Sequence, residues 1–386
     1  MTATRWPNVL FLDQSGQLGG AEFALLDIVR RWEGQCRVVT FESGLFPQEV
    51  GRAGIDCVVA DYGISSIRRE SGPVAAVQTV NALRATTAAV NRQAGAFELI
   101  YANTQKAAVV GAMVATARRI PLIVHLHDIL TDDHFSRFNQ TMSRIALSRA
   151  QTVIADSEAT ANAYTQVRGS EKRTTVIHYG FEEPEPRDPM VVRRELGIDP
   201  TAPTVGIFSR LSPWKGQEVV LDAMAQLPDV QALIVGDALF GETAFARELA
   251  RRAETLNVSQ RVHFLGFRKD VADLMAACDL TIHASTAPEP FGRVIVESML
   301  TGTPVVATNA GGPQSILTEN HDGWLVPPAD TDALVAAVRN ALSSSERLRE
   351  VGENARTTAL EQYPMSAYIE NIRSECHRAV GGNDIV

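Results

Sequence analysis

The chain has 386 residues, of which 45% are hydrophobic and only 6% aromatic. Its length exceeds one ordinary hydrophobic core, so we expect two well-packed α/β domains rather than a β-sandwich or a disordered polymer. The formal net charge of -9 argues against a nucleic-acid partner, because phosphate binding needs a positive field.

Four cysteines are scattered along the chain without a Cys-x-x-Cys pair: Cys36, Cys57, Cys278 and Cys376. This spacing indicates reduced thiols rather than a zinc site or a disulfide framework. The N-terminal apolar run is too short for a signal peptide, and no apolar run approaches the roughly 18 residues of a membrane span. We therefore expect a cytoplasmic protein.

Short apolar runs alternate with longer amphipathic stretches, which is typical of βαβ units around a parallel sheet. In the first half we predict helices at Ala21–Arg31, Val74–Gln93 and Lys106–Arg118. The strands predicted there are Val9–Leu12, Arg37–Phe41, Cys57–Ala60, Leu99–Tyr101, Leu122–His125 and Thr152–Ala155.

A second series of the same kind begins near residue 204. Its predicted strands are Thr204–Phe208, Ala232–Val235, Val262–Phe264, Leu280–His283, Pro304–Ala307 and Gly323–Val326. Helices are predicted over 216–226, 242–256, 270–277, 292–301, 312–318 and 330–343, with a final one over Ser366–Val380. The two halves thus repeat one doubly wound architecture.

The segment 181–189 separates the two halves. Three prolines among acidic residues predict an extended connector here and exclude a helix. We therefore predict an N-terminal domain over 1–182, completed by the helix 366–380, a linker over 183–190 and a C-terminal domain over 191–365. Two such Rossmann-like domains are expected to face each other across a central cleft, with ligands at the carboxyl ends of their strands.

The strongest motif is Ala287-Pro-Glu-Pro-Phe-Gly-Arg-Val-Ile-Val-Glu297, in which Glu289 and Glu297 are separated by seven residues. Glu289 precedes a turn and can accept hydrogen bonds from sugar hydroxyls, while Glu297 lies more than one turn into a helix. The amides of Gly292, Arg293 and Val294 in the first helical turn suit a diphosphate.

A second motif, Phe208-Ser-Arg-Leu-Ser-Pro-Trp-Lys-Gly-Gln217, places Arg210 and Lys215 on one loop after a strand. Arginine offers a bidentate fork and lysine a mobile point charge. Together they can neutralise a diphosphate leaving group without a metal ion. We interpret Trp214 in this loop as a packing residue.

These two segments resemble those of the GT4 family of retaining glycosyltransferases, which have the two-domain GT-B fold, and the resemblance extends over nearly the whole chain. It implies that Arg210 and Lys215 clamp the diphosphate, that Glu297 binds the ribose and that Glu289 binds the transferred sugar. Amides near Phe291 and Gly292 would assist, and Phe267, in the loop Gly266-Phe267-Arg268, would lie at the nucleobase.

In the first half, Ser15-Gly-Gln-Leu-Gly-Gly-Ala-Glu22 resembles the glycine loop of the same family, in which Gly19 and Gly20 would approach the donor phosphate. Its G-x-x-G-G pattern is not the G-x-G-x-x-G of nicotinamide-dependent enzymes. We place Glu22 on the acceptor side.

Two further strand ends carry polar residues in this half. The resemblance assigns His127 a contact with the reacting sugar, with a positioning role rather than that of a base, and the neighbouring Asp128 could orient its ring. Asn103 ends another strand and is a candidate contact for the acceptor or the sugar.

Two surface features of the first half have alternative interpretations. His125, His127, Asp128, Asp132, Asp133 and His134 could suggest a metal site, but they lack a ligand set of fixed spacing, so we expect no metal. The arginines at 68, 69, 118, 119, 144 and 149 could meet anionic lipid at the inner face of the membrane or form an ordinary solvated face.

The sequence therefore predicts a metal-independent retaining hexosyltransferase, with catalytic His127, Arg210, Lys215 and Glu289. Its donor is a UDP-sugar in preference to a GDP-sugar, its acceptor is a saccharide or lipid-linked saccharide, and the nucleotide sugar is a substrate rather than a cofactor. Two alternatives remain open, namely a non-hydrolysing nucleotide-sugar epimerase and a non-catalytic sugar-nucleotide-binding module.

Overall fold

The structure is a computed structural model that describes residues 5–64, 73–129, 144–168, 174–238 and 242–381. The chain forms two compact units, called here the N-terminal unit (Met1–Tyr179 with Ser366–Val386) and the C-terminal unit (Gly180–Met365). The predicted linker over 183–190 lies inside the C-terminal unit, whereas the segment 366–380 belongs to the N-terminal unit.

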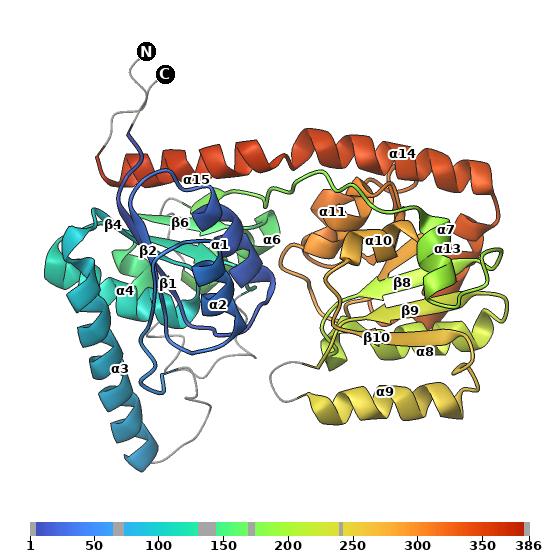
Figure 1. The fold of residues 1–386 in the computed structure, drawn as a ribbon, viewed down its shortest axis with the longest axis horizontal. Helices are drawn as coiled ribbons and strands as arrows, with labels where there is room; N and C mark the ends of the chain where they lie inside the picture. Colours follow the sequence, from blue (N-terminus) through green and yellow to red (C-terminus); the bar gives the residue numbers. More distant parts are fainter. Residues whose placement is uncertain (1–4, 65–72, 130–143, 169–173, 239–241, 382–386) are drawn as a thin grey trace. The chain divides into compact units, whose positions relative to one another are not determined.

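The described residues of the N-terminal unit form a seven-stranded parallel sheet in the order β3-β2-β1-β4-β5-β6-β7, of which Figure 1 labels β1, β2, β4 and β6. The strands are β1 Val9–Asp13, β2 Cys36–Thr40, β3 Cys57–Val59, β4 Leu99–Ala102, β5 Leu122–Leu126, β6 Thr152–Ala155 and β7 Thr174–Val176. The helices are α1 Gly20–Arg30, α2 Leu45–Arg52, α3 Pro73–Gln93, α4 Gln105–Arg118, α6 Glu158–Arg168 and α15 Met365–Ala379, with the short 3-10 helix η1 Ala94–Ala96.

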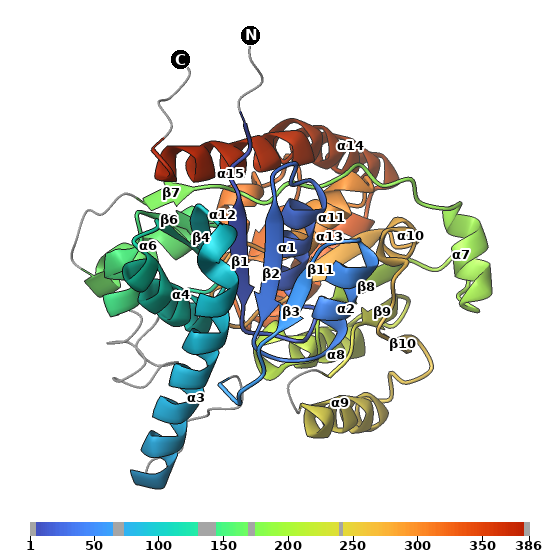
Figure 2. The same ribbon diagram turned by 60° about the vertical axis from the view of Figure 1, so that its left-hand side comes forward.

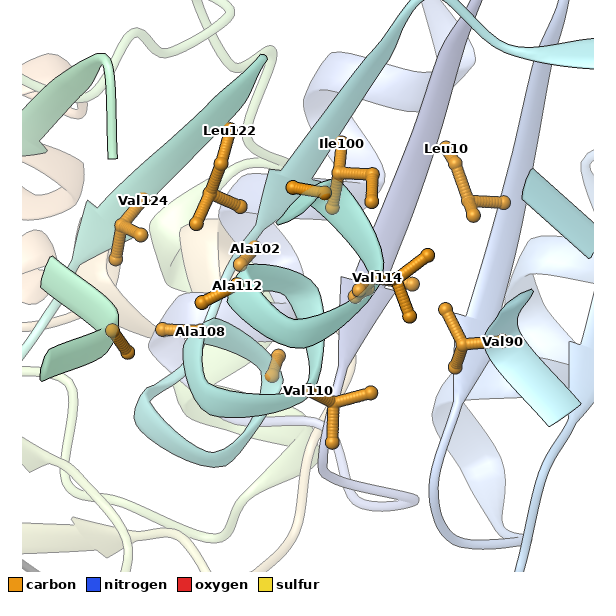
Figure 3. Packing of buried hydrophobic residues seen from close by; sticks show 14 of the residues in the cluster. Leu10, Val90, Ile100, Ala102, Ala108, Val110, Ala112, Val114, Leu122 and Val124 are labelled. Atoms are coloured by element: carbon orange, nitrogen blue, oxygen red, sulfur yellow. The ribbon is translucent and has the colours of Figure 1, made fainter. Parts of the chain in front are cut away.

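Helix α4 illustrates how small residues bring a helix onto this sheet (Figure 3). Its side chains Val110 and Val114 are fully buried, as is Ile100 on the facing strand. A Cβ added at Gly111 would come within 3.1 Å of Leu122 Cδ1, so the small residues of α4 set a close approach. Burial of each large aliphatic side chain stabilises the unit by about 1.5–3 kcal/mol.

The C-terminal unit contains a six-stranded parallel sheet in the order β10-β9-β8-β11-β12-β13. Its strands are β8 Thr204–Phe208, β9 Gln231–Val235, β10 Val262–Gly266, β11 Leu280–His283, β12 Val305–Thr308 and β13 Trp324–Val326. The helices are α7 Pro189–Glu195, α8 Gln217–Gln226, α9 Thr243–Thr255, α10 Val271–Ala276, α11 Arg293–Leu300, α12 Pro313–Ile316, α13 Thr331–Leu342 and α14 Ser345–Gln362, with the 3-10 helix η2 Pro213–Lys215.

Helix α7 corrects part of the connector prediction. Pro189 was expected to exclude a helix, but it is the first residue of α7, where a missing N–H costs nothing and the fixed φ of proline suits the helix. Asp188 caps this helix by accepting a hydrogen bond from the Met190 amide at 2.8 Å. The connector is therefore extended only up to Asp188.

Both sheets reverse their strand order beside the first strand, between β1 and β4 in one unit and between β8 and β11 in the other. Such switch points at the carboxyl edge are where doubly wound folds bind ligands. Within the described residues, no helix combines the length and the apolar character needed to cross a membrane.

Candidate active site

The loops after β8 and β11 meet at the switch point of the C-terminal unit. The Thr286 amide donates to the Trp214 carbonyl at 2.8 Å, which joins the two loops directly. Gly216 has a φ of 75°, and a Cβ there would lie 1.9 Å from the Ala284 carbonyl oxygen. Glycine is therefore required for both the backbone conformation and the close approach of these loops.

Glu289 and Lys215, predicted from separate motifs, form an ion pair in this structure. Lys215 Nζ lies 2.6 Å from Glu289 Oε2, and the two side chains are only 15% and 11% exposed. The Ser285 hydroxyl donates to the same oxygen at 2.8 Å. His283 Nε2 lies 3.1 Å from it and donates, since a carboxylate oxygen can only accept.

These contacts determine the charge of Glu289. Burial alone would raise the pKa of its carboxyl, but the Lys215 ammonium and the His283 hydrogen bond together outweigh burial and hold the pKa well below its ordinary value. Glu289 is therefore a carboxylate at neutral pH, suited to accept hydrogen bonds.

Trp214 supports both cations of the first loop. Lys215 Nζ lies 3.9 Å from the centroid of the indole ring, and Arg210 Cζ lies 5.7 Å from it. A cation over an indole face is attracted by the ring electrons. The interpretation of Trp214 as a packing residue is thus incomplete, because its half-buried ring also holds Arg210 and Lys215 next to one another.

A second loop braces the segment that carries Glu289. The Glu289 amide donates to the Ala310 carbonyl at 3.1 Å, and the Gly312 amide donates to the Glu289 carbonyl at 2.8 Å. A Cβ at Gly311 would lie 2.2 Å from the Glu289 carbonyl oxygen, in a backbone with a φ of 81°. The position of the carboxylate is therefore fixed through its own main chain.

Helix α11 begins directly after this segment, with Gly292 at its N-cap in a left-handed conformation. The Phe291 side chain is buried against Phe181 and Tyr363, so this residue can offer only its backbone to a ligand. Arg293 lies over the Phe181 ring at 4.7 Å.

Inside α11, Arg293 pairs with Glu297, with Nε and Oε1 3.5 Å apart. Val294 and Glu297 are half-buried. The sequence motif did not indicate the pair between Arg293 and Glu297, although both residues were predicted to bind the donor.

Phe267 follows β10, where the nucleobase was expected. Its side chain is 54% exposed. The preceding Gly266 has a φ of 64° and accepts a hydrogen bond from the Gly236 amide at 2.9 Å. The loop therefore presents an aromatic surface to solvent at the carboxyl edge of the sheet.

The glycine loop of the N-terminal unit leads directly into helix α1, and its expected approach to the donor phosphate stays a prediction. Helix α1 begins at Gly20, with Gly19 as N-cap, and Glu22 Oε2 accepts a hydrogen bond from the Gly19 amide at 2.9 Å. Burial, followed by the nearby charges of Asp13 and Asp128, raises the pKa of Glu22 to about 8. Glu22, predicted on the acceptor side, is thus a buried helix cap that holds the loop.

Polar residues also follow the adjacent strands of this sheet. The His127 ring is held by Asn103 on one nitrogen at 2.8 Å and by Tyr179 on the other at 2.5 Å. Asp128, which was expected to orient this ring, has an exposed side chain. Asn103 is fully buried and also bonds to the buried Asp13 at 2.7 Å.

Sequence reasoning missed His283, Ser285, Asp13, Tyr179 and Asp156. All of these except Tyr179 are polar residues at or just beyond the end of a buried strand, which is a signal that could have found them. Tyr179 gives no such signal.

Among the described residues, no group of histidines, cysteines and acids is arranged to hold a metal ion. Asp132, Asp133 and His134, and also Arg68 and Arg69, lie outside the described residues. His125 and His127 do share one face, with ring centroids 4.0 Å apart.

Two doubly wound units with charged residues at their switch points are typical of proteins that bind nucleotides at the carboxyl edges of parallel sheets. The family model described as "Glycosyl transferases group 1" matches residues 191–358, and the "Glycosyl transferase 4-like domain" model matches residues 19–180. The chain therefore belongs to the group 1, GT4-like glycosyltransferases, and its fold is of the GT-B type.

Curated relatives resemble part of the chain. The lipopolysaccharide core biosynthesis mannosyltransferase LpsB of Rhizobium meliloti (strain 1021) is 32% identical over 234 residues, which is 57% of this chain and 65% of that protein. The D-inositol 3-phosphate glycosyltransferase of Mycobacterium marinum (strain ATCC BAA-535 / M) is 32% identical over 52% of this chain and 44% of that protein. The matches thus span less than two thirds of these relatives' own lengths.

A solved structure resembles nearly the whole chain. The crystal structure of Anabaena Alr3699/HepE in complex with UDP-glucose has a TM-score of 0.87 and 39% sequence identity, and it covers 96% of this chain and 100% of that one. The same Anabaena protein has also been solved in complex with UDP, and with UDP and glucose.

Proposed function

We propose that this glycosyltransferase transfers a hexose from a nucleotide sugar, a UDP-sugar in preference to a GDP-sugar, to a hydroxyl of a saccharide or lipid-linked saccharide. The observation that carries the proposal is the Lys215–Glu289 ion pair next to Arg210, at the switch point of the C-terminal unit. Similarity to a protein solved with UDP-glucose, at 39% identity, supports the choice of donor.

The cations would stabilise the departing diphosphate. As the bond from the anomeric carbon to the phosphate oxygen breaks, negative charge develops on the diphosphate. Arg210, Lys215 and the amides at the start of α11 are donors held in place before the reaction, which is the most effective form of electrostatic catalysis. Such a set makes a metal ion unnecessary, so we propose metal-independent transfer.

Glu289 would bind hydroxyls of the transferred sugar, and Glu297 those of the ribose. We propose retention of anomeric configuration. The acceptor oxygen forms its bond to the anomeric carbon on the face from which the diphosphate leaves, and its proton passes to a phosphate oxygen of the departing group. In the N-terminal unit, His127 would contact the reacting sugar without taking that proton.

The experiment compares Arg210→Ala and Lys215→Ala with Arg251→Ala, which removes an exposed cation from the same unit. We expect each of the first two to lower kcat with UDP-glucose by at least about 100-fold, while Arg251→Ala keeps wild-type activity. Near-normal turnover in either of the first two would refute the assignment. Product NMR reads the anomeric configuration, and EDTA tests the independence from metal.

Two outcomes of the same assay would favour the alternatives. Conversion of the donor in the absence of any acceptor would indicate an epimerase. Tight binding of UDP without any product, with a broad panel of saccharide and lipid-linked acceptors, would indicate a binding module. Thermal shifts with UDP, GDP and ADP rank the bases, because a ligand that binds only the folded state raises its stability.

We further propose that the enzyme works in the cytoplasm and contacts the membrane through its N-terminal unit. Helix α3 extends away from the sheet (Figures 1 and 2) and exposes Val77 and Val80, with exposed fractions of 61% and 44%. Arg118 and Arg144 are exposed in the same unit. Sedimentation with vesicles of anionic and of neutral lipid tests this, and equal absence of binding to both would refute it.

A further inference from the structure

A chain of hydrogen bonds runs across the carboxyl ends of four neighbouring strands in the N-terminal unit. Asp13 is the last residue of β1. Asn103 directly follows β4, His127 directly follows β5 and Asp156 directly follows β6. Asp13 bonds to Asn103 at 2.7 Å and Asn103 to His127 at 2.8 Å. Tyr179 then joins His127 to Asp156, at 2.5 Å and 3.0 Å.

The Asn103 amide sets the direction of this chain. Its nitrogen donates one hydrogen to Asp13 Oδ2 at 2.7 Å and the other to the Ala21 carbonyl at 3.0 Å. The reversed amide would place its oxygen against a carboxylate and a carbonyl, neither of which can donate. The amide oxygen therefore faces His127, and because it can only accept, His127 Nε2 must carry a hydrogen.

The other ring nitrogen is engaged as well. Tyr179 donates its hydroxyl hydrogen to Asp156 at 3.0 Å, and in that arrangement His127 Nδ1 donates to the Tyr179 oxygen. If the hydroxyl turned toward His127 instead, Nδ1 would accept. In both arrangements Nε2 keeps its hydrogen, because this depends on Asn103 alone.

Burial shows that Asn103 acts through its neighbours. Asp13 and Asn103 are fully inaccessible, and Asp156 and Tyr179 are 1% and 3% exposed, whereas His127 is half-buried. Asn103 has no accessible surface through which it could contact an acceptor directly. In place of the predicted acceptor contact, its amide oxygen holds the His127 ring.

We propose that Asn103 is a positioning residue that, anchored by Asp13 and the Ala21 carbonyl, fixes the His127 ring in the form protonated at Nε2. This rests on the proposed contact of His127 with the sugar. With one nitrogen committed to Asn103 and the other to Tyr179, the ring holds a fixed orientation and has no free nitrogen to take the proton of the acceptor.

The test replaces Asn103 with leucine, which has a similar shape but no hydrogen-bonding groups, and with aspartate. Burial beside the Asp13 carboxylate favours the protonated form of that aspartate, which donates to Asp13 and keeps an oxygen that accepts from His127, and which lacks only the hydrogen bond to the Ala21 carbonyl. Asn91→Leu is the matched control, because Asn91 accepts a hydrogen bond from Arg118 on the surface of the same unit. The two readouts are the 15N NMR signals of the imidazole, which distinguish protonated from bare ring nitrogens, and kcat and KM with UDP-glucose.

We expect wild-type His127 to be protonated at Nε2. Asn103→Leu should lose this signature and lower kcat about 10- to 100-fold, with KM for the donor changed less than about threefold, because the ring is misplaced while the donor site is intact. Asn103→Asp should keep the Nε2 hydrogen and a larger share of kcat than the leucine variant. Asn91→Leu should match the wild type in both readouts.

A bare Nε2 in the wild type would overturn the proposal, as would a leucine variant that keeps both the Nε2 hydrogen and full kcat. If the leucine variant does not fold, the wild-type and aspartate spectra still decide the matter. The NMR readout needs no substrate. Absence of transferase activity would therefore refute the proposed function while leaving the role of Asn103 to be judged from the spectra.

Discussion

Replacing Glu289 by glutamine should destabilise the C-terminal unit although the two side chains have the same shape. Three donors converge on Oε2 of this buried carboxylate, at 2.6 Å from Lys215, 2.8 Å from Ser285 and 3.1 Å from His283. A hydrogen bond to a charged group is worth about 1 kcal/mol more than one between neutral groups. Loss of the charge therefore costs about 3 kcal/mol, at the lower end of the roughly 3–5 kcal/mol known for breaking a buried ion pair.

Urea unfolding of the C-terminal unit measures this cost, and Asp222→Asn supplies the control. Asp222 also pairs with an arginine in this unit, but the two side chains are 31% and 37% exposed, so its loss should cost no more than about 1 kcal/mol. Equal destabilisation by the two variants would contradict the claim that burial makes the Glu289 pair costly to break.

A double-mutant cycle isolates the ion pair. Lys215→Met alone leaves the Glu289 carboxylate buried without its cation, whereas the double variant Lys215→Met with Glu289→Gln leaves no buried charge at that position. We therefore expect the double variant to be more stable than the sum of the two single changes implies, by at least about 1 kcal/mol. Additivity to within about 0.5 kcal/mol would refute the coupling of these two residues.

Two further changes test the loops. Gly216→Ala should lower the melting temperature of the C-terminal unit more than the control Gly197→Ala. Both positions have a left-handed backbone, but a Cβ at Gly216 would lie 1.9 Å from a backbone oxygen, whereas at Gly197, with a φ of 69°, no atom lies within 4 Å. Equal shifts would contradict the steric argument. Glu22→Gln should gain stability relative to the wild type as pH rises from 5 to 8. Folding raises the pKa of Glu22 from 4.5 to about 8, so the wild type loses up to about 1.4 kcal/mol per pH unit in this window and the amide does not. Calorimetry at both pH values, with exposed Glu353→Gln as control, checks the sign, and a difference independent of pH would contradict it.

The predicted strands agree with the structure because each one is a short, mainly apolar run, fully buried in the centre of the sheets and partly exposed at Val59 in β3 and Phe264 in β10. Val9–Leu12 and Thr204–Phe208, for example, lie within or coincide with β1 and β8. Runs of this kind bounded by polar loops have few alternatives to a central parallel strand. The strand order follows from the same pattern, once each half is recognised as a doubly wound sheet.

Helix α14 was missed because its buried face is made of small residues. The side chains it buries are Val351, Ala355 and Ala359. Gly352 packs so closely against the turn after α11 that a Cβ would lie 2.2 Å from the Gly302 carbonyl oxygen. A helix that packs through glycine and alanine gives almost no apolar periodicity. The contact between Gly352 and Gly302 forms only when the chain folds, so a single sequence does not reveal it.

The candidate site shows the same limit. The motifs gave Arg210, Lys215 and Glu289, because charged residues after strands are visible in the sequence. That Lys215 and Glu289 bond to each other, and that His283 completes the set, depends on the distance between two loops 74 residues apart. That distance is set by the pairing of β8 with β11 and by the close approach of the two loops at Gly216. The positions of the charged residues in the sequence predict neither of these.

The pairing of Lys215 with Glu289 is compatible with the separate tasks proposed for the two residues. A lysine ammonium has three donors, of which Glu289 takes one, while the indole of Trp214 faces the charge. The remaining hydrogens are available to a diphosphate. Among the described residues, every hydrogen bond to the Glu289 carboxylate reaches Oε2, so contact with sugar hydroxyls falls to Oε1. The ion pair therefore fixes the distance between the proposed diphosphate clamp and the carboxylate proposed to bind the sugar, which is the preorganisation that electrostatic catalysis requires.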